Sequence, residues 1–297
     1  MDNLLIPPSP ELTTEEIQRF SSYAKQLGKA QSAPILRHQN GQDISRKKGH
    51  GIELREIRPY VSTDDVRHMD WRVTARTGTP HTRVYTEDVE HRTFIICSFS
   101  KDAYFGTETT FISTRLTQIA ALIGWRSYIT RDPLSMLTCQ EQSFELTNIV
   151  RDWQTWGQGL AYLTKIDNRA CSNQYFNLPN HLLVKGSNII ILSDQMFVSE
   201  KSRAILTQLA KHNRVHWLSL EDANTFSIPD GIYQFSHQKK AIEINTAHRK
   251  EAKQRYLEQF QKHHQLLVSL GIPKLTFNVN ESPIAIVKTL LNMGALH

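Results

Sequence analysis

From residue 92 onward, short apolar runs alternate with longer stretches that have helical periodicity. Residues 93–97 (TFIIC) and residues 188–194 (NIIILSD) are rich in β-forming side chains, as is typical of strands that are buried on both faces. In the stretch after the first run, apolar residues recur at helical spacing at Ile112, Leu116, Ile119 and Ile123. This alternation predicts parallel βαβ units and therefore an α/β fold with a doubly wound, mostly parallel sheet.

The same pattern predicts the remaining elements. Helices are expected over about 14–28, 108–130, 148–165, 199–212 and 247–270, and from residue 283 onward. Short strands are expected at 136–139, 144–146, 215–220 and 275–280, with a loop over 167–187. Thr13 and Glu16 have the spacing of a capping box at the start of the first helix. Asp230-Gly231 predicts a hairpin that joins 232–237 to 241–246.

The pattern divides the chain into three parts. Residues 1–30 are expected to form an extended lead-in and a helix, and residues 92–297 the α/β domain. Between them, residues 31–91 predict a small β subdomain that is rich in arginine and aspartate, with short strands and turns over 52–90.

The basic residues of this subdomain are unusual, because every strongly basic residue between Gly51 and Ser100 is an arginine. Guanidinium groups pair with carboxylates in a bidentate manner and stack on aromatic rings, whereas ammonium groups act as point charges. The segment therefore has two interpretations. It forms a structural ion-pair network that holds the subdomain against the sheet, or part of it faces outward and docks a partner.

Composition restricts the class of protein. The formal net charge is +6 and the pI is about 9.2, which favours acidic partners, but no nucleic-acid-binding motif is present. The basic run over 45–51 is either solvated or an anionic docking loop. Three widely spaced cysteines, Cys97, Cys139 and Cys171, favour a reducing compartment. The N-terminus lacks a signal-peptide pattern and no apolar stretch has membrane-spanning length, so we expect a cytoplasmic protein.

Polar side chains follow two of the buried runs. Ser98, Ser100 and Asp102 come after the first run, and Asp194 ends the second. Ligands of open α/β sheets bind at the carboxyl ends of strands, and these oxygens suit Mg²⁺ or Ca²⁺. Lys101 opposes a cation there, and the alternative is a set of turn residues that satisfy the backbone. No nucleotide-binding or hydrolase motif is present, so we expect no enzymatic activity.

The stretch from Gly51 to Gly106 closely resembles the hallmark segment of the domain-of-unknown-function-58 family, and the resemblance extends over roughly residues 11–293. The matching block, interpreted as a network or docking surface, comprises Arg58, Tyr60, Asp64, Asp65, Arg67, Asp70, Trp71, Arg76, Arg83 and Glu87. The resemblance implies a von Willebrand factor A-like domain with an extra β subdomain in front. It also implies a degenerate metal-adhesion loop, because Ser98 stands where the family has aspartate, while Asp194 matches the later acidic position.

Members of this family are often encoded beside MoxR-type AAA+ ATPases and other von Willebrand A-like proteins. The resemblance therefore implies a non-enzymatic adaptor that works with such an ATPase in the assembly or maturation of complexes, including complexes at the membrane. Two alternatives are a divalent-metal-dependent adhesion domain or enzyme, and a protein that binds an anionic surface or nucleic acid through Arg46, Lys47 and Lys48.

Overall fold

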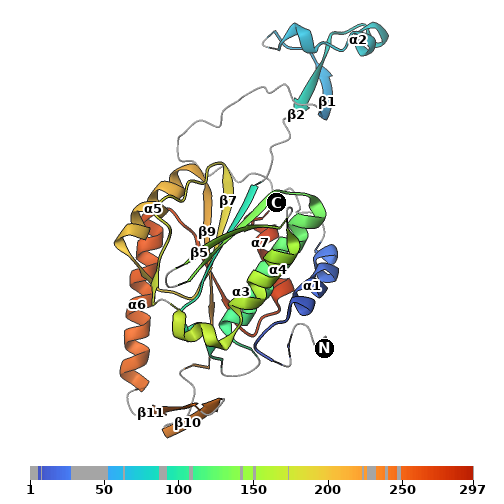
Figure 1. Ribbon diagram of the computed structural model, residues 1–297. Helices are drawn as coiled ribbons and strands as arrows, with labels where there is room; N and C mark the ends of the chain where they lie inside the picture. Colours follow the sequence, from blue (N-terminus) through green and yellow to red (C-terminus); the bar gives the residue numbers. More distant parts are fainter. Residues whose placement is uncertain are drawn as a thin grey trace. The chain divides into compact units, whose positions relative to one another are not determined.

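The computed structural model describes residues 6–7, 9–27, 53–62, 64–86, 92–106, 110–140, 143–149, 152–172, 174–222, 224–225, 232–237, 240–245 and 249–296. The chain forms two compact units (Figure 1). Residues 1–33 and 91–297 form one, the α/β unit, and residues 34–90 form the other, the inserted unit.

A six-stranded sheet forms the centre of the α/β unit, in the order β12-β9-β7-β3-β4-β5. The strands are β3 (Arg92–Ser98), β4 (Leu134–Cys139), β5 (Phe144–Asn148), β7 (Ser187–Ser193), β9 (Arg214–Glu221) and β12 (Lys274–Asn278). Every neighbouring pair is parallel except β4 and β5, which are antiparallel. The predicted α/β class and mostly parallel sheet are therefore confirmed.

Helices cover both faces of this sheet (Figure 1). One apolar cluster joins it to α1 (Thr14–Gln26), α3 (Ile112–Thr130), α4 (Trp153–Leu163) and α7 (Pro283–Asn292). A second cluster lies on the other face with α5 (Glu200–His212) and α6 (Arg249–Ser269). Alternate residues of β3 enter the two clusters, Ile95 and Cys97 in the first and Phe94 and Ile96 in the second, because strand side chains alternate between faces. This explains why the central strands are continuous apolar runs.

The first helix belongs to the α/β unit. The predicted capping box is confirmed, because the Glu16 backbone N–H donates to Thr13 Oγ1 at 3.2 Å and the Thr13 N–H donates to Glu16 Oε2 at 2.9 Å. On the packed side, Trp125 Nε1 of α3 donates to the Ile17 carbonyl at 2.7 Å. The helix is therefore tied to α3 as well as capped.

The inserted unit contains an element that the pattern did not predict. Its antiparallel strands β1 (Glu53–Pro59) and β2 (His81–Thr86) enclose a 3₁₀ turn, η1 (Val66–His68), and a short helix, α2 (Trp71–Thr77). The expectation of strands and turns alone was therefore wrong over α2. Asp70 caps the helix at its start, and Gly78 ends it with a φ of 75°, a left-handed conformation that favours glycine.

The other differences lie at element boundaries and in short segments. The predicted helix over 148–165 begins only at Trp153, because Asp152 accepts hydrogen bonds from the N–H groups of Gln154 and Thr155. The predicted loop over 167–187 contains parts of η3 (Ile166–Cys171) and β6 (Tyr175–Phe176). The remaining elements are η2 (Lys101–Tyr104), β8 (Phe197–Val198), β10 (Ile232–His237) and β11 (Lys240–Asn245), and the last two form the predicted hairpin. Among the helices described, none combines the length and apolar character that crossing a bilayer requires.

The contact between α3 and α4 depends on a glycine. A Cβ atom on Gly124 would lie 2.1 Å from Cζ2 of the fully buried Trp156, so a side chain there cannot be accommodated without moving the ring. We expect Gly124→Ala to lower the free energy of unfolding by about 1–3 kcal/mol, measured by denaturant titration.

The matched control is Gly159→Ala on α4, where a Cβ atom would meet nothing within 4 Å. This substitution is expected to raise the free energy of unfolding by about 0.5–1 kcal/mol, because alanine loses less conformational freedom in a helix. Equal effects of the two substitutions would contradict the packing described here.

Candidate functional site at the carboxyl edge of the sheet

The carboxyl ends of β3 and β7 bring together residues that the sequence predicted to meet. The two strands are neighbours, with Ser98 opposite Ser193. The Ser100 backbone N–H donates to Asp194 Oδ1 at 2.8 Å, and Ser100 Oγ donates to Asp194 Oδ2. Both oxygens of this carboxylate are therefore engaged by one serine.

Ser98 has a different partner, which the sequence did not indicate. Its buried hydroxyl donates to Gln195 Oε1 at 2.7 Å, and the Gln195 backbone N–H donates to Ser193 Oγ at 3.1 Å. Gln195 directly follows Asp194, and this adjacency is the only signal that could have suggested its role. A neutral amide thus accepts the hydrogen bond of the Ser98 hydroxyl.

Asp102 lies on η2 beside this arrangement. Its backbone N–H donates to Ser100 Oγ at 3.0 Å, so Ser100 caps the turn, while the Asp102 side chain is exposed, as is Lys101. Burial raises the pKa of Asp194 to about 6, the negative charge of Asp102 adds to that increase, and the hydrogen bonds from Ser100 oppose it. Asp194 therefore titrates well above the usual range of a carboxyl group.

The donor set does not suit a divalent cation in this arrangement. Mg²⁺ and Ca²⁺ favour several carboxylate oxygens, yet among the described residues the loops that directly follow β3 and β7 provide only Asp102 and Asp194, and the second is occupied by Ser100. In the part of the chain that the structure describes, no three histidine, cysteine, aspartate or glutamate residues come together as metal ligands. The hydrogen bonds instead fasten the loop after β3 to the end of β7.

A small cleft lies beside Asp194, between the ends of β7 and β9 and the helix α6. Its lining includes Asp194, Glu221, Phe260 and Lys274, and its free volume of about 10 Å³ holds roughly one water molecule. Lys274 Nζ lies 3.4 Å from the centroid of the Phe260 ring. Burial lowers the pKa of Lys274 to about 8, and the negative charge of Glu221 partly offsets this decrease. The ammonium group of Lys274 thus occupies the part of this cleft that Glu221 and Phe260 line.

A buried histidine, His263, lies in the same cleft. The adjacent His264 of α6 is exposed. His263 is 2% exposed, its ring meets the Trp217 ring edge-on at 4.8 Å, and neither ring nitrogen has a hydrogen-bond partner. Burial lowers its pKa to about 3, so the imidazole is neutral at physiological pH.

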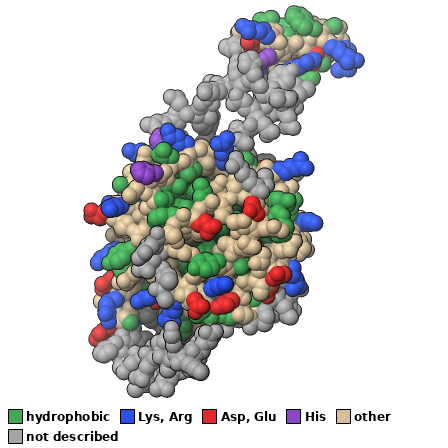
Figure 2. Space-filling model, in the orientation of Figure 1, with side chains coloured by type: hydrophobic (Ala, Val, Ile, Leu, Met, Phe, Trp, Pro, Cys, Tyr) green, Lys and Arg blue, Asp and Glu red, His purple; other side chains and the backbone are tan. Residues whose placement is uncertain are grey.

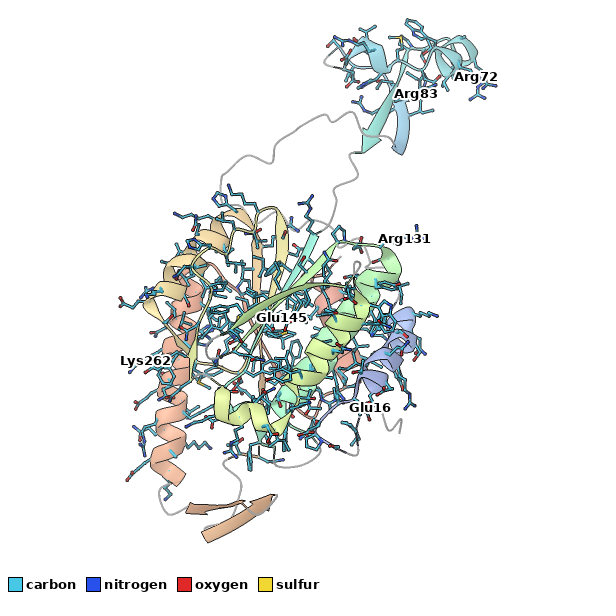
Figure 3. All side chains as sticks on the ribbon, viewed as in Figure 1. Glu16, Arg72, Arg83, Arg131, Glu145 and Lys262 are labelled. Carbon is cyan, nitrogen blue, oxygen red and sulfur yellow. The ribbon has the colours of Figure 1, made fainter. Side chains whose placement is uncertain are left out.

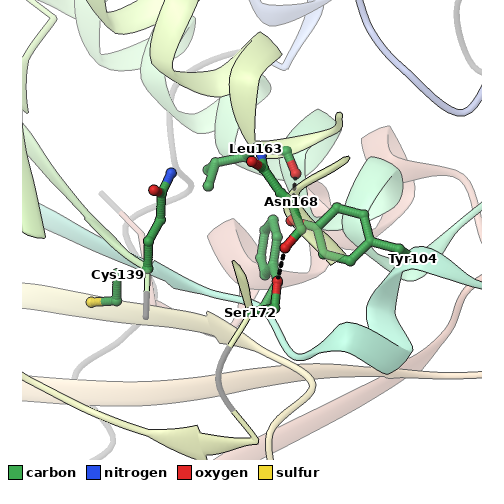
Figure 4. A pocket seen from close by; sticks show the side chains of 7 residues that line it. Tyr104, Cys139, Leu163, Asn168 and Ser172 are labelled. Atoms are coloured by element: carbon green, nitrogen blue, oxygen red, sulfur yellow. Dashed lines mark hydrogen bonds between the residues drawn. The ribbon is translucent and has the colours of Figure 1, made fainter. Parts of the chain in front are cut away.

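A second pocket lies at the carboxyl ends of β3 and β4 (Figure 4). The Tyr104 hydroxyl donates to the Leu163 carbonyl at 2.9 Å and is also hydrogen bonded to Ser172. This pocket also has about 10 Å³ of free volume. Burial raises the pKa of the nearby thiol of Cys139 to about 12, so it stays protonated and is a poor nucleophile.

The inserted unit contains the family-like residues, and six of them form three ion pairs, of which the pair of Arg67 with Asp65 is the longest at 3.7 Å. Arg58 Nη2 lies 2.7 Å from Asp64 Oδ1, and Arg83 Nε lies 2.9 Å from Asp70 Oδ2. Asp70 is 4% exposed, and its Oδ1 also accepts from the N–H groups of Arg72 and Val73 at 3.0 and 3.1 Å. Each of these contacts joins two residues of the inserted unit, so they stabilise that unit internally.

Other residues of the inserted unit face solvent. Trp71 is 66% exposed, and Arg67, Arg72 and Arg76 are also exposed. Figure 3 shows Arg72 projecting from α2 while Arg83 lies on β2. The exposed large apolar and arginine residues of η1 and α2 are called here the α2 face, and they are Val66, Arg67, Trp71, Arg72 and Arg76.

Three residues of the block complete this description. Asp65 caps η1 by accepting from the Arg67 N–H at 2.9 Å. Tyr60 is half-buried. Glu87 lies outside the described residues, as do Arg46, Lys47 and Lys48.

Comparison with known proteins gives a family match. The model of a family described as protein of unknown function DUF58 matches residues 56–266. An uncharacterized protein of Mycobacterium bovis and two of Mycobacterium tuberculosis are each 43% identical over 68 residues, which is 23% of this chain and 22% of the relative. The match thus spans about a fifth of the length of these curated relatives. No solved structure matches the chain.

The raised pKa of Asp194 predicts a pH dependence of stability. The stability linked to this group is fully present below the unfolded pKa of 3.8 and is lost as the pH rises through about 6. We expect the free energy of unfolding of the wild type, relative to Asp194→Asn, to fall by about 1–3 kcal/mol between about pH 4 and pH 7.

Asp152→Asn is the control with the opposite sign. Hydrogen bonds from Thr155 lower the pKa of Asp152, so its stabilising contribution is lost as the pH falls. Denaturant titrations at several pH values measure the free energy of unfolding of the wild type relative to each variant. If this difference changed with pH in the same direction for both variants, the opposite pKa shifts of Asp194 and Asp152 would be contradicted.

The donor set also predicts how the edge responds to metal. We expect titration calorimetry of the wild type with Mg²⁺, Mn²⁺ or Ca²⁺ to give no binding heat. Ser98→Asp adds a third carboxylate and is expected to create a measurable cation affinity, whereas Ser98→Asn adds a side chain of similar size without charge and should not. Saturable binding to the wild type would show that Ser100 releases Asp194, contrary to this account.

Proposed function

The chain belongs to the DUF58 family of proteins of unknown function, and we propose that it is a non-enzymatic adaptor that docks onto a MoxR-type AAA+ ATPase through the α2 face of its inserted unit. In this proposal the α/β unit is von Willebrand A-like and contacts the client complex or other von Willebrand A-like proteins. We propose that the protein acts in the cytoplasm, where its clients include complexes that are assembled at the membrane.

The observation that carries the proposal is the exposure of Trp71. A tryptophan that is 66% exposed leaves a large apolar surface in water, although Asp70 and Arg83 hold the start of its helix in place. Tryptophan and arginine are the residues most enriched among the energetic centres of protein interfaces. A rigidly presented Trp71 between arginines supports a docking role.

The charge of the same unit supports an acidic partner surface. The described side chains between residues 57 and 83 include five arginines and three aspartates, an excess of two positive charges. Because Asp64 and Asp70 are paired inside the unit, the exposed Arg72 and Arg76 remain as surface charge. Such a surface favours association with carboxylate-rich protein surfaces and speeds it at low ionic strength.

The carboxyl edge of the sheet supports binding rather than turnover. The Ser100 hydroxyl donates to Asp194 and accepts from the Asp102 N–H, which gives it a structural role. The described thiols, Cys97 and Cys139, are buried, and burial raises the pKa of each. We therefore assign the contact between Ser100 and Asp194 to fastening the loop after β3, not to a nucleophile with its general base.

The test is the affinity of the chain for a MoxR-type AAA+ ATPase, measured by interferometry with and without ATP and Mg²⁺. We expect Trp71→Ala and Arg72→Glu each to weaken binding by about tenfold or more. The wild-type affinity is expected to fall as salt increases, because exposed charges are screened.

Matched controls lie on the α/β unit. Tyr162→Ala removes another exposed aromatic ring, and Lys262→Glu makes the same change of charge on α6, so both should leave the affinity unchanged. Circular dichroism confirms that each variant is folded. An absence of binding in every nucleotide state, or equal losses in the controls, would overturn the proposal.

A further inference from the structure

Lys274 begins the edge strand β12, and its half-buried side chain turns toward α6. Its ammonium nitrogen, Nζ, lies 3.4 Å from the centroid of the Phe260 ring. Among the described residues, no carboxylate forms an ion pair with this group, although Glu221 lines the same cleft. An aromatic ring replaces only part of the hydration that an ammonium group loses on burial, so its charged form is disfavoured.

The position of Lys274 gives it the chemistry of a nucleophile. Burial lowers its pKa to about 8, and roughly a tenth of the side chains therefore carry a neutral amine at about pH 7. At the ordinary lysine pKa of 10.5 this fraction would be less than about a thousandth. Lysines that are desolvated in this way form Schiff bases with carbonyl compounds, because the neutral amine has a free electron pair.

His263 adds unsatisfied hydrogen-bonding groups to the same cleft. It is 2% exposed, and neither of its ring nitrogens has a hydrogen-bond partner. After burial, the positive charge of Lys274 is the next cause that lowers the pKa of His263, so the two groups interact across the cleft. A neutral imidazole has one N–H donor and one acceptor nitrogen, and buried groups of this kind normally have partners. A small polar molecule in the cleft would supply one.

The cleft restricts the size of such a molecule. Its free volume of about 10 Å³ corresponds to roughly one water molecule. A carbonyl compound with one or two carbon atoms is only slightly larger, whereas a sugar or a nucleotide is far larger. The ligand class that fits is therefore a very small carbonyl compound.

The charge of the cleft restricts the class further. Burial raises the pKa of Tyr256, and the negative charges of Glu221 and Asp194 add to that increase, so the fields of both carboxylates reach the cleft. A negative potential opposes an anionic product, such as the carbamate that carbon dioxide forms with an amine. It favours a protonated imine, because that product keeps the positive charge of Lys274 over the Phe260 ring.

We propose that Lys274 is a covalent binding site for a small uncharged aldehyde, which it holds as a protonated imine in the cleft between β9, β12 and α6. The amine nitrogen attacks the carbonyl carbon and forms a carbinolamine. The carbinolamine hydroxyl group then leaves as water with a proton from solvent, and the C=N nitrogen keeps one hydrogen and the positive charge. The step needs no oxidant or reductant, and it is independent of the docking role proposed for the α2 face.

The test uses dilute formaldehyde as the probe on the full folded chain, with cyanoborohydride to reduce each imine to a stable methylamine. Lysine and arginine side chains are spread over the visible face of the α/β unit (Figure 2), so the comparison is made within one chain. The reference is Lys262, an exposed lysine of α6 (Figure 3). We expect peptide mass spectrometry at about pH 7 to show methylation of Lys274 about tenfold or more faster than that of Lys262.

Two variants identify the residue independently. The first adduct that appears in the intact mass of the wild type should be missing in Lys274→Arg and retained in Lys262→Arg. Both substitutions keep the positive charge, and circular dichroism confirms that each variant is folded. Methylation of Lys274 at the same rate as Lys262 or more slowly, or an unchanged first adduct in Lys274→Arg, would overturn the proposal.

A larger aldehyde tests the limits that the cleft sets. Pyridoxal phosphate is too large for a water-sized space, and its phosphate is repelled by the carboxylates of Glu221 and Asp194. After borohydride reduction, we expect it to modify Lys274 no faster than Lys262. Preferential modification of Lys274 by pyridoxal phosphate would contradict the size and charge of the proposed ligand.

Discussion

The buried carboxylate of Asp70 is the interaction on which the inserted unit depends. One oxygen accepts two backbone N–H groups at the start of α2, and the other accepts Arg83 Nε from β2. Arg83 and these hydrogen bonds lower the pKa of Asp70, so the charged form is favoured in the folded unit. A helix of seven residues cannot be stable alone, and this carboxylate fixes it on the hairpin. Trp71 is consequently presented from a defined position.

A similar interaction organises the carboxyl edge of the α/β unit. There the carboxylate of Asp194 accepts both donors of Ser100 and so joins the loop after β3 to the end of β7. In many α/β proteins this edge holds a ligand, but here the polar groups are largely satisfied by one another. The family-like arginines and the exposed Trp71 lie instead on the inserted unit, and the proposed recognition is assigned to that unit for this reason.

The sequence predicted features that depend on local patterns. The buried strands were recognisable because both of their faces are apolar, and the meeting of Ser100 with Asp194 followed from the rule that parallel strands end at one edge. It did not identify Gln195 as the partner of Ser98, because this uncharged residue belongs to no motif and only its position next to Asp194 could have suggested the contact. The helix α2 was missed since it is short and lacks an apolar stripe. The burial of His263 could not be predicted, because the Trp217 ring that it contacts belongs to a strand distant in sequence.

The measurement that tests the account most directly is hydrogen–deuterium exchange of the full chain with and without the partner ATPase. The account predicts slower exchange over residues 66–76 when the ATPase is added, with no change over residues 98–102. Protection of the carboxyl edge without any change in α2 would contradict it.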